Sequence, residues 1–175
     1  LLASPKVETE KKVIPKDICF VVDTSGSMSG DKHKQVQNAL KFCVNNLEEE
    51  DRFNIISFAT EPRPYEKNLV NAKKENIEDA LKYIEGMRAI GGTNINEALY
   101  KALKMDFAKD KPAFIVFLTD GMPTVDITDP SEILKNVKKE NELKIKIFCF
   151  GVGTDLNTTL LDKLGYLMQR YALTP

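Results

Sequence analysis

The 175-residue sequence contains one histidine, His33, and it has no phosphate-binding loop of the Gly-Lys-Ser or Gly-Lys-Thr type. A Ser-His-Asp triad needs a histidine beside both an acid and a nucleophile, and His33 lies at a predicted helix start, on a face expected to be solvated. Gly151-Val-Gly153 lacks the third glycine of a dinucleotide-binding turn and does not follow the first strand. The sequence therefore favours neither a triad hydrolase nor a nucleotide-binding protein.

Cysteine is scarce, and the three present do not form a disulfide framework. Cys19 and Cys149 lie in apolar strand patterns, and Cys43 lies on the apolar stripe of a predicted helix. Their spacing fits no zinc-binding pattern, so we expect three buried thiols that pack as small hydrophobic groups. Unpaired cysteines lean slightly toward a non-oxidising compartment such as the cytoplasm.

The sequence also lacks a strong net charge and a long apolar run. Its formal net charge is −1, which gives no reason to expect binding to nucleic acid or to an anionic membrane. No apolar stretch approaches the roughly 20 residues that a transmembrane helix needs, so no direct membrane insertion is expected. The 42% hydrophobic content and the length suit one globular domain with a two-sided core.

What the sequence does contain is a regular alternation of strand and helix patterns. We expect strands at 18–22, 53–58, 113–118 and 145–152, separated by helices whose apolar residues recur at helical spacing. Asn94 and Asp129-Pro130 are typical of helix N-termini and predict that helices begin there. This alternation predicts an α/β fold: a doubly wound, mostly parallel sheet with helices on both faces.

Several details refine this expectation. The proline-containing segment 60–70 predicts an antiparallel edge strand, and the very apolar segment 113–118 predicts a central one. The acidic run 48–51 should end the first long helix in solvent. Residues 1–16 read as a linker or lead-in from a preceding domain, which leaves 17–175 as the folded domain. A loop, a cap at Asn157 and a final helix are expected over 153–164.

Two acids and three hydroxyl side chains occupy positions typical of a metal site. Asp23, Ser25 and Ser27 alternate directly after the first strand, and Asp120 follows the strand at 113–118. Because ligands of such sheets bind beyond the carboxyl ends of strands, both acids are expected at the binding edge. Thr93, in Gly91-Gly-Thr-Asn-Ile-Asn96, supplies another oxygen, and hard oxygen donors suit Mg²⁺.

The order Asp23-x-Ser25-x-Ser27, Thr93, Asp120 resembles the metal-ion-dependent adhesion site of the von Willebrand factor type A domain, which has a Rossmann-like fold. The similarity extends from about Lys16 to Leu164. It is greatest to the version found in inter-alpha-trypsin inhibitor heavy chains and their bacterial relatives. Four segments carry that likeness: 23–30, 51–54, 91–96 and 118–124.

The resemblance implies a non-enzymatic protein-binding module of the adhesion type, in a secreted, periplasmic or cell-surface protein with several domains. Asp23, Ser25, Ser27, Thr93 and Asp120 would bind Mg²⁺, with Mn²⁺ or Ca²⁺ as alternatives, and an Asp or Glu of a protein partner would complete the coordination. Two other functions stay open. One is a metal-dependent hydrolase or phosphotransferase using Asp23, and the other is an intracellular assembly factor that acts with a partner ATPase.

Two departures from the family pattern concern the ends of the domain. After the position of Leu164 the family usually continues with an acidic–Asn–Gly stretch, a strand and a last helix, and residues 165–175 do not read that way. The C-terminal end of the domain is therefore expected to be truncated or to pack differently. The β-rich domain and C-terminal attachment region of the heavy chains have no counterpart in these residues, so attachment to a matrix polysaccharide is not carried over.

Overall fold

The structure is a computed structural model that describes residues 14–120, 122–153 and 163–164. Most of the expected lead-in, the expected cap at Asn157 and most of the expected last helix lie outside these residues. Within the described part of the chain, no helix has the length and apolar character needed to cross a membrane.

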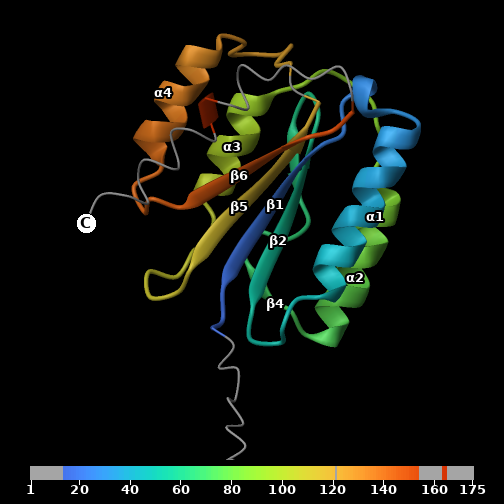
Figure 1. Cartoon of the computed structure of the whole chain (residues 1–175), viewed down its shortest axis with the longest axis vertical. Coiled ribbons are helices and arrows are strands. Elements are labelled where there is room, and N and C mark those ends of the chain that lie inside the picture. The colour runs from blue at the N-terminus through green and yellow to red at the C-terminus, as the bar shows by residue number, and fades with distance from the viewer. Residues whose placement is uncertain (1–13, 121, 154–162, 165–175) are drawn as a thin grey trace, which may run out of the picture.

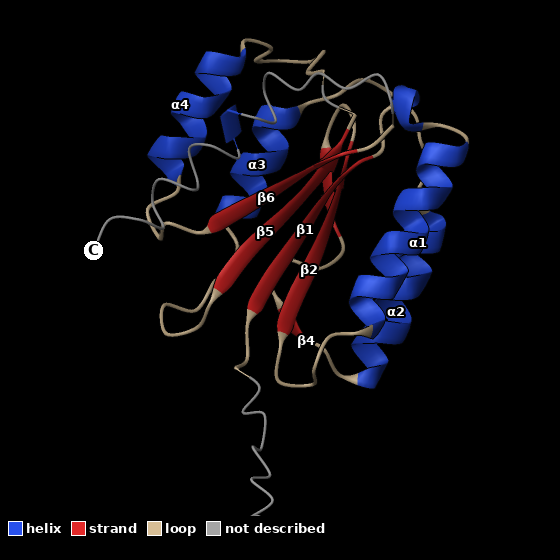
Figure 2. Cartoon of the chain, in the orientation of Figure 1, coloured by secondary structure: helices blue, strands red, loops and turns tan. Residues whose placement is uncertain are grey.

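Strands and helices alternate along the chain as the sequence predicts (Figures 1 and 2). The elements are β1 (Asp17–Asp23), the short 3₁₀ helix η1 (Gly26–Met28), α1 (Asp31–Asn45), β2 (Arg52–Phe58), β3 (Pro62–Pro64), β4 (Val70–Asn71), α2 (Lys74–Gly86), α3 (Ile95–Leu103), β5 (Ala113–Thr119), α4 (Pro130–Glu140) and β6 (Lys146–Gly151).

The strands form one sheet in the order β3-β2-β1-β5-β6, with β4 also paired to β2. The pairs β1–β2, β1–β5 and β5–β6 are parallel, so these four strands end at the same edge of the sheet. From β1 the chain continues on one side to β2 and later returns on the other side as β5. The point between β1 and β5 is therefore the switch in strand order at which such sheets bind ligands.

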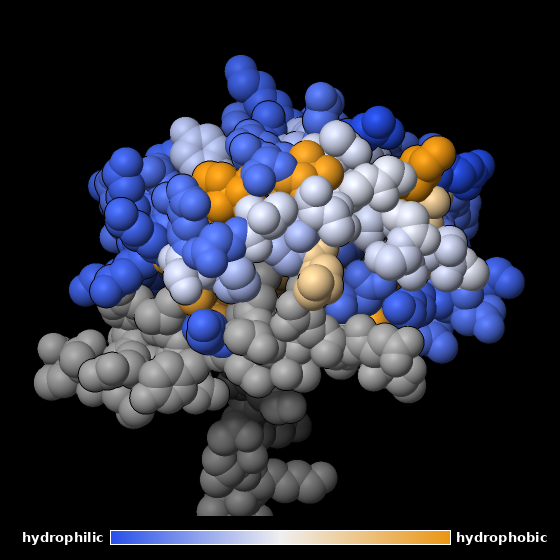
Figure 3. Space-filling view, turned by 90° about the horizontal axis from the view of Figure 1, so that it is seen from above, coloured by the Kyte–Doolittle hydropathy of each residue, from blue (hydrophilic) through white to orange (hydrophobic). Residues whose placement is uncertain are grey.

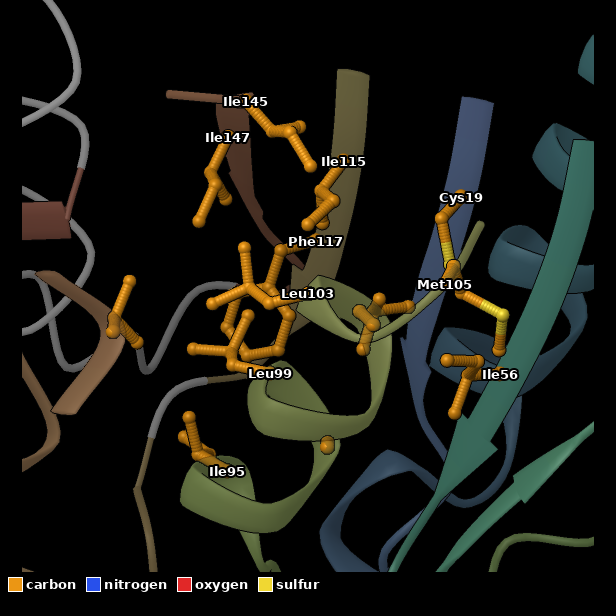
Figure 4. Close-up of a cluster of buried hydrophobic side chains, with 14 of the residues drawn as sticks. Cys19, Ile56, Ile95, Leu99, Leu103, Met105, Ile115, Phe117, Ile145 and Ile147 are labelled. Atoms are coloured by element: carbon orange, nitrogen blue, oxygen red, sulfur yellow. The ribbon is translucent and has the colours of Figure 1, made fainter. Parts of the chain in front are cut away.

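Helices cover the sheet from two sides, which confirms the predicted doubly wound fold. α1 and α2 lie on one side, and α3 and α4 lie on the other (Figure 1). Alternate residues of β1 enter the two cores, since Phe20 packs with Leu40 and Ile84 from the first pair of helices. Cys19 instead faces the core that contains Leu99 of α3, where Figure 4 shows the side chains of β5 and β6 gathered around this helix.

The predicted antiparallel edge is present but divided. β3 and β4 both run antiparallel to β2, and the loop between them leaves the sheet. The Tyr65 N–H still donates to the Ile55 carbonyl, but the next N–H, of Glu66, donates to the Asn54 side chain, so the β3 pairing stops after three residues.

The expectation that 113–118 forms the central strand is only partly correct. β5 has a strand on each side, but β1 occupies the middle of the five-strand order and is buried along its whole length. Phe114, Val116 and Leu118 of β5 are only half-buried, and Phe148 of the neighbouring β6 is exposed. Apolar composition alone therefore did not identify the strand that is most completely buried.

The prediction that Cys43 is a buried thiol is wrong. Val36, Leu40 and Val44 are the buried residues of α1, whereas Cys43 is exposed. The helix is rotated toward α2, to which Gln37 donates a hydrogen bond of 2.7 Å at the Ile84 carbonyl. This rotation turns the side of α1 that carries Cys43 away from the core. Cys19 is buried as predicted, and Cys149 is half-buried.

Two polar residues expected in solvent are instead buried or half-buried and form hydrogen bonds. Asp51 is fully buried, and its carboxylate accepts hydrogen bonds from the Lys16 and Glu48 backbone N–H groups and from the Lys16 ammonium. His33 is half-buried, and its Nε2 lies 3.1 Å from the carbonyl oxygen of Met87. Because a carbonyl only accepts, this ring nitrogen carries the proton in that contact.

Candidate metal centre

The two predicted acidic ligands come from neighbouring strands at the switch in strand order. Asp23 is the last residue of β1, and Asp120 immediately follows β5. The register pairs Val22 with Leu118, which places Asp23 beside Thr119. The backbone of the sheet thus brings together two carboxylates that are 97 positions apart in sequence, since the register fixes both strand ends.

The Asp23 carboxylate is fully buried and is held by neutral hydrogen-bond donors. Its Oδ1 accepts from the Ser25 backbone N–H at 2.8 Å, and its Oδ2 accepts from the Thr119 hydroxyl at 2.5 Å. Burial raises the pKa of the Asp23 carboxyl, hydrogen bonds from Ser25 and Thr119 oppose that rise, and the Asp120 charge adds to it. This carboxylate would gain from a nearby cation, which would offset the cost of burying its charge.

A short chain of oxygen atoms joins the first loop to Asp120. Ser25 Oγ lies 3.1 Å from Ser27 Oγ, and the Ser27 hydroxyl donates to Asp120 Oδ1 at 3.0 Å. Ser25 and Asp120 are buried, whereas Ser27 is exposed. Four of the five predicted ligands are thereby linked in one cluster that has an exposed side.

Thr93 belongs to a loop that is fastened to both neighbouring loops. The Gly26 N–H donates to the Gly91 carbonyl at 3.0 Å, and the Thr93 N–H donates to the Thr124 hydroxyl at 2.9 Å. Gly91 has a φ of 94°, a conformation that favours glycine and lets this turn approach the first loop. Thr93 is buried, but within the described residues its hydroxyl is not hydrogen-bonded to any of the other four predicted ligands.

One cation already lies in the cluster. The Lys32 ammonium donates to Asp120 Oδ2 at 3.1 Å, so the two Asp120 oxygens have different partners. The ammonium is partly exposed and the carboxylate is buried, with side-chain exposures of 29% for Lys32 and 9% for Asp120. Asp23 has no comparable ion pair among the described residues.

The donor set fits a small hard cation. Two carboxylates can balance a divalent charge, and serine and threonine hydroxyls add neutral oxygens. Neighbouring ligands of an octahedral Mg²⁺ with bonds of about 2.1 Å lie about 3.0 Å apart. The separations Ser25–Ser27 and Ser27–Asp120 are 3.1 and 3.0 Å, which are hydrogen-bond distances and keep these oxygens close enough to be offered to one ion. No group of three or more His, Cys, Asp or Glu side chains suited to a metal occurs among the described residues.

A family model for the von Willebrand factor type A domain matches residues 16–169, which is most of the chain. The chain belongs to this family. It is 38% identical over 159 residues to inter-alpha-trypsin inhibitor heavy chain H4 of Homo sapiens, a match that covers 86% of this chain and 17% of that protein. The type A domain resemblance and its heavy-chain character are both confirmed. The chain nevertheless spans less than a fifth of the length of such relatives.

Solved structures confirm the fold. An aerotolerance-related membrane protein from Bacteroides fragilis aligns with a TM-score of 0.70 at 16% identity, over 87% of this type A domain and 88% of that chain. Proximal thread matrix protein 1 from the mussel byssus, in a structure with a zinc-occupied adhesion-site motif, aligns with a TM-score of 0.69 at 22% identity. That match covers 86% of this domain and 39% of the mussel chain.

Three residues of the site were not identified from the sequence. Thr119 donates to Asp23, Lys32 pairs with Asp120, and Thr124 fastens the Thr93 loop. Thr119 and Thr124 lie in the quoted segment 118–124, so the motif contained them without indicating their roles. Lys32 did carry a signal, because a cation in the first turn of a helix opposes the helix dipole and calls for a compensating contact.

Proposed function

We propose that this domain is a non-enzymatic protein-binding module whose adhesion-type site uses a divalent cation. Mg²⁺ is the favoured ion, with Mn²⁺ and Ca²⁺ as alternatives, and the ligands are Asp23, Ser25, Ser27, Thr93 and Asp120. The observation that carries the proposal is the cluster in which Ser25, Ser27 and Asp120 oxygens lie 3.0–3.1 Å apart beside buried Asp23.

A protein carboxylate is the partner group that best suits such a cation. Five protein donors leave one position of an octahedral ion to a ligand from outside, and hard cations prefer charged oxygen. The exposed Ser27 shows that the cluster is reachable from solvent. Seen from above, onto the end where the parallel strands finish, the described surface is mostly hydrophilic or intermediate in character (Figure 3). Such a surface suits a polar contact centred on an Asp or Glu of the partner.

A cavity beside the site would accommodate the residues that flank this carboxylate. It has a volume of about 460 Å³ and shares Thr24 and Gly91 with the loops of the site. Arg63 and Arg88 line it together with one acid, Glu61. A partner segment with acidic residues next to its metal-binding carboxylate would therefore be favoured over a basic one.

The hydrolase or phosphotransferase alternative gains less support. A nucleophilic Asp23 would have to meet a substrate, yet its carboxylate is fully buried and both its oxygens accept hydrogen bonds. The matched relatives are named as heavy chains of an inhibitor and not as enzymes. The assembly-factor alternative has no feature of the described structure in its favour.

Isothermal titration of the domain with Mg²⁺ and Mn²⁺ tests the proposal directly. Asp23→Ala should abolish or strongly weaken binding, because it removes one of the two carboxylates. Asp31→Ala is the matched control, since Asp31 is an exposed acid in the first turn of α1 and should leave binding unchanged. Circular dichroism of each variant checks the fold. Equal affinities in the parent and Asp23→Ala would refute the site.

A further inference from the structure

Lys32 holds a position that the metal-binding proposal leaves unexplained. Its ammonium lies 3.1 Å from Asp120 Oδ2, while the other oxygen of the same carboxylate accepts from Ser27. A positive charge thus lies directly against one of the two acids proposed to hold a divalent cation. Like charges repel, so the ammonium and a divalent cation bound to the same carboxylate would oppose each other.

The side chain of Lys32 reaches Asp120 from the first turn of α1 and passes close to Gly153. Lys32 lies in the first turn of α1, where the helix dipole disfavours a cation. Its stem passes so close to Gly153 that a Cβ atom at that position would lie 2.5 Å from Lys32 Cε. Gly153 also has a φ of 101°, which favours glycine. The stem of Lys32 thus lies against the end of β6, and the ion pair with Asp120 offsets the unfavourable helix position.

We propose that Lys32 is a built-in counter-ion that competes with the divalent cation for Asp120 and so lowers the affinity of the site for metal. Without metal, the ammonium neutralises Asp120 and prevents it from facing Asp23 as a second uncompensated charge. With metal, the same charge opposes the incoming ion until the ammonium moves away from the carboxylate. The inference rests on the proposed function, since it concerns the metal of that site.

The charge of Lys32 is separable from its packing. Lys32→Met keeps an unbranched stem against Gly153 and removes the ammonium, whereas Lys32→Arg keeps a positive charge. Lys34→Met is the matched control, because Lys34 lies on an exposed position of the same helix. Calorimetric titration with Mn²⁺, in the parent and all three variants, measures the metal affinity.

Lys32→Met should bind Mn²⁺ about tenfold or more tightly than the parent, because a nearby like charge has been removed. Lys32→Arg and Lys34→Met should stay within about threefold of the parent, since neither removes charge from the cluster. In chelator, Lys32→Met should melt at a lower temperature than the parent, because Asp120 has lost its counter-ion. Its melting temperature should then rise more steeply than that of the parent when Mn²⁺ is added.

The outcomes distinguish the failure of this inference from the failure of the proposed metal site. If Asp23→Ala binds Mn²⁺ as the parent does, the metal site itself is wrong. If Asp23→Ala loses binding while Lys32→Met binds no more tightly than the parent, only the competition is wrong. A purely structural lysine would lower the melting temperature of Lys32→Met equally with and without metal, and that result would also overturn the inference.

Discussion

The two acids of the candidate site have unequal surroundings. Asp23 is surrounded by neutral donors and has a raised pKa because of its burial, whereas Asp120 has the ammonium of Lys32 beside it. The placement of both acids at one edge of the sheet could be predicted from the sequence because each follows an apolar strand. Their unequal partners could not, since Thr119 and Lys32 reach them through the register of β5 and the orientation of α1.

Asp51 is a further acid whose surroundings could not be predicted from the sequence. In sequence it is the last member of an acidic run, and the three preceding glutamates are exposed as expected. Its carboxylate nevertheless turns inward to accept from the Lys16 and Glu48 backbone N–H groups. Composition predicts the average exposure of such a run, but a local hydrogen-bond arrangement decides the exposure of each member.

At the residue scale, Cys19 should make stability fall at alkaline pH. Burial raises the pKa of its thiol above the ordinary value of 9.0, so in this range the unfolded chain releases the proton and the folded chain keeps it. The free energy of unfolding is therefore unaffected by this thiol below pH 9. Above pH 9 it declines, and the loss due to this thiol is about 1.4 kcal/mol at pH 10. Urea denaturation at pH 8 and pH 10 measures the loss.

Comparison of two cysteine variants isolates this effect from the other groups that titrate in the same range. Cys19→Ala should lose less stability between pH 8 and pH 10 than the parent does. Cys43→Ala, at the exposed cysteine, should follow the parent much more closely. An unchanged pH dependence in Cys19→Ala would show that its thiol is not protected as the burial indicates.

At the scale of single elements, the strand and helix pattern was predictable because each signal is local. The helical spacing of apolar residues, the continuous apolar runs of the strands and the helix caps all depend on residues close in sequence. Asn94 and Asp129 both accept from the N–H three residues later, at 3.1 and 2.8 Å. The apolar spacing also indicated the inward side of α1, but it did not predict how wide the buried face is, and Cys43 lies outside that face.

Asp129 gives a direct test of one such local signal. Its side chain caps α4 by accepting from the Glu132 N–H, and Pro130 follows at the first turn. Asp129→Ala should lower the free energy of unfolding by about 1 kcal/mol, because the N–H of Glu132 loses its partner. Asp129→Ser should keep most of that stability. Urea denaturation measures both, and equal losses in the two variants would show that the cap hydrogen bond does not stabilise the helix.

At the scale of the whole molecule, the two cores are complete without a metal ion. Each face of the sheet has its own cluster of buried apolar residues, and the candidate site lies outside both. Lys32 also compensates one of the two acids in the absence of metal. The cation should therefore add ordinary ligand stabilisation and should not be required for folding, unlike the metal of a zinc finger.

Chelator should accordingly lower the melting temperature by about 2–10 °C, which corresponds to roughly 1–3 kcal/mol of ligand stabilisation in a domain of this size. Differential scanning calorimetry in Mg²⁺ and in chelator provides the measurement. Asp23→Ala is the control, and its melting temperature should not respond to Mg²⁺. Loss of the cooperative transition in chelator would show instead that the metal is structural.

The binding of a partner is the property of the whole domain that the loops, cavity and cation would serve together. In the proposed site, two acids would bring a divalent ion close to neutrality, while hydroxyl ligands such as Thr93 would leave it able to accept one more anionic oxygen. Thr93→Asp adds a third carboxylate, which would occupy the position proposed for the partner. We expect this variant to keep the fold and to lose partner binding, whereas Thr93→Ser should retain much of it because the hydroxyl remains.

The partner for this test is a protein captured by the parent domain in Mg²⁺ and released by chelator. Surface-based binding then compares the parent, Thr93→Asp and Thr93→Ser, with circular dichroism as the check on folding. A Thr93→Asp variant that is folded and binds as well as the parent in Mg²⁺ would mean that the partner does not contact this ion. The adhesion-type function would then fail even if calorimetry had established the metal site, because the cation would have no part in recognition.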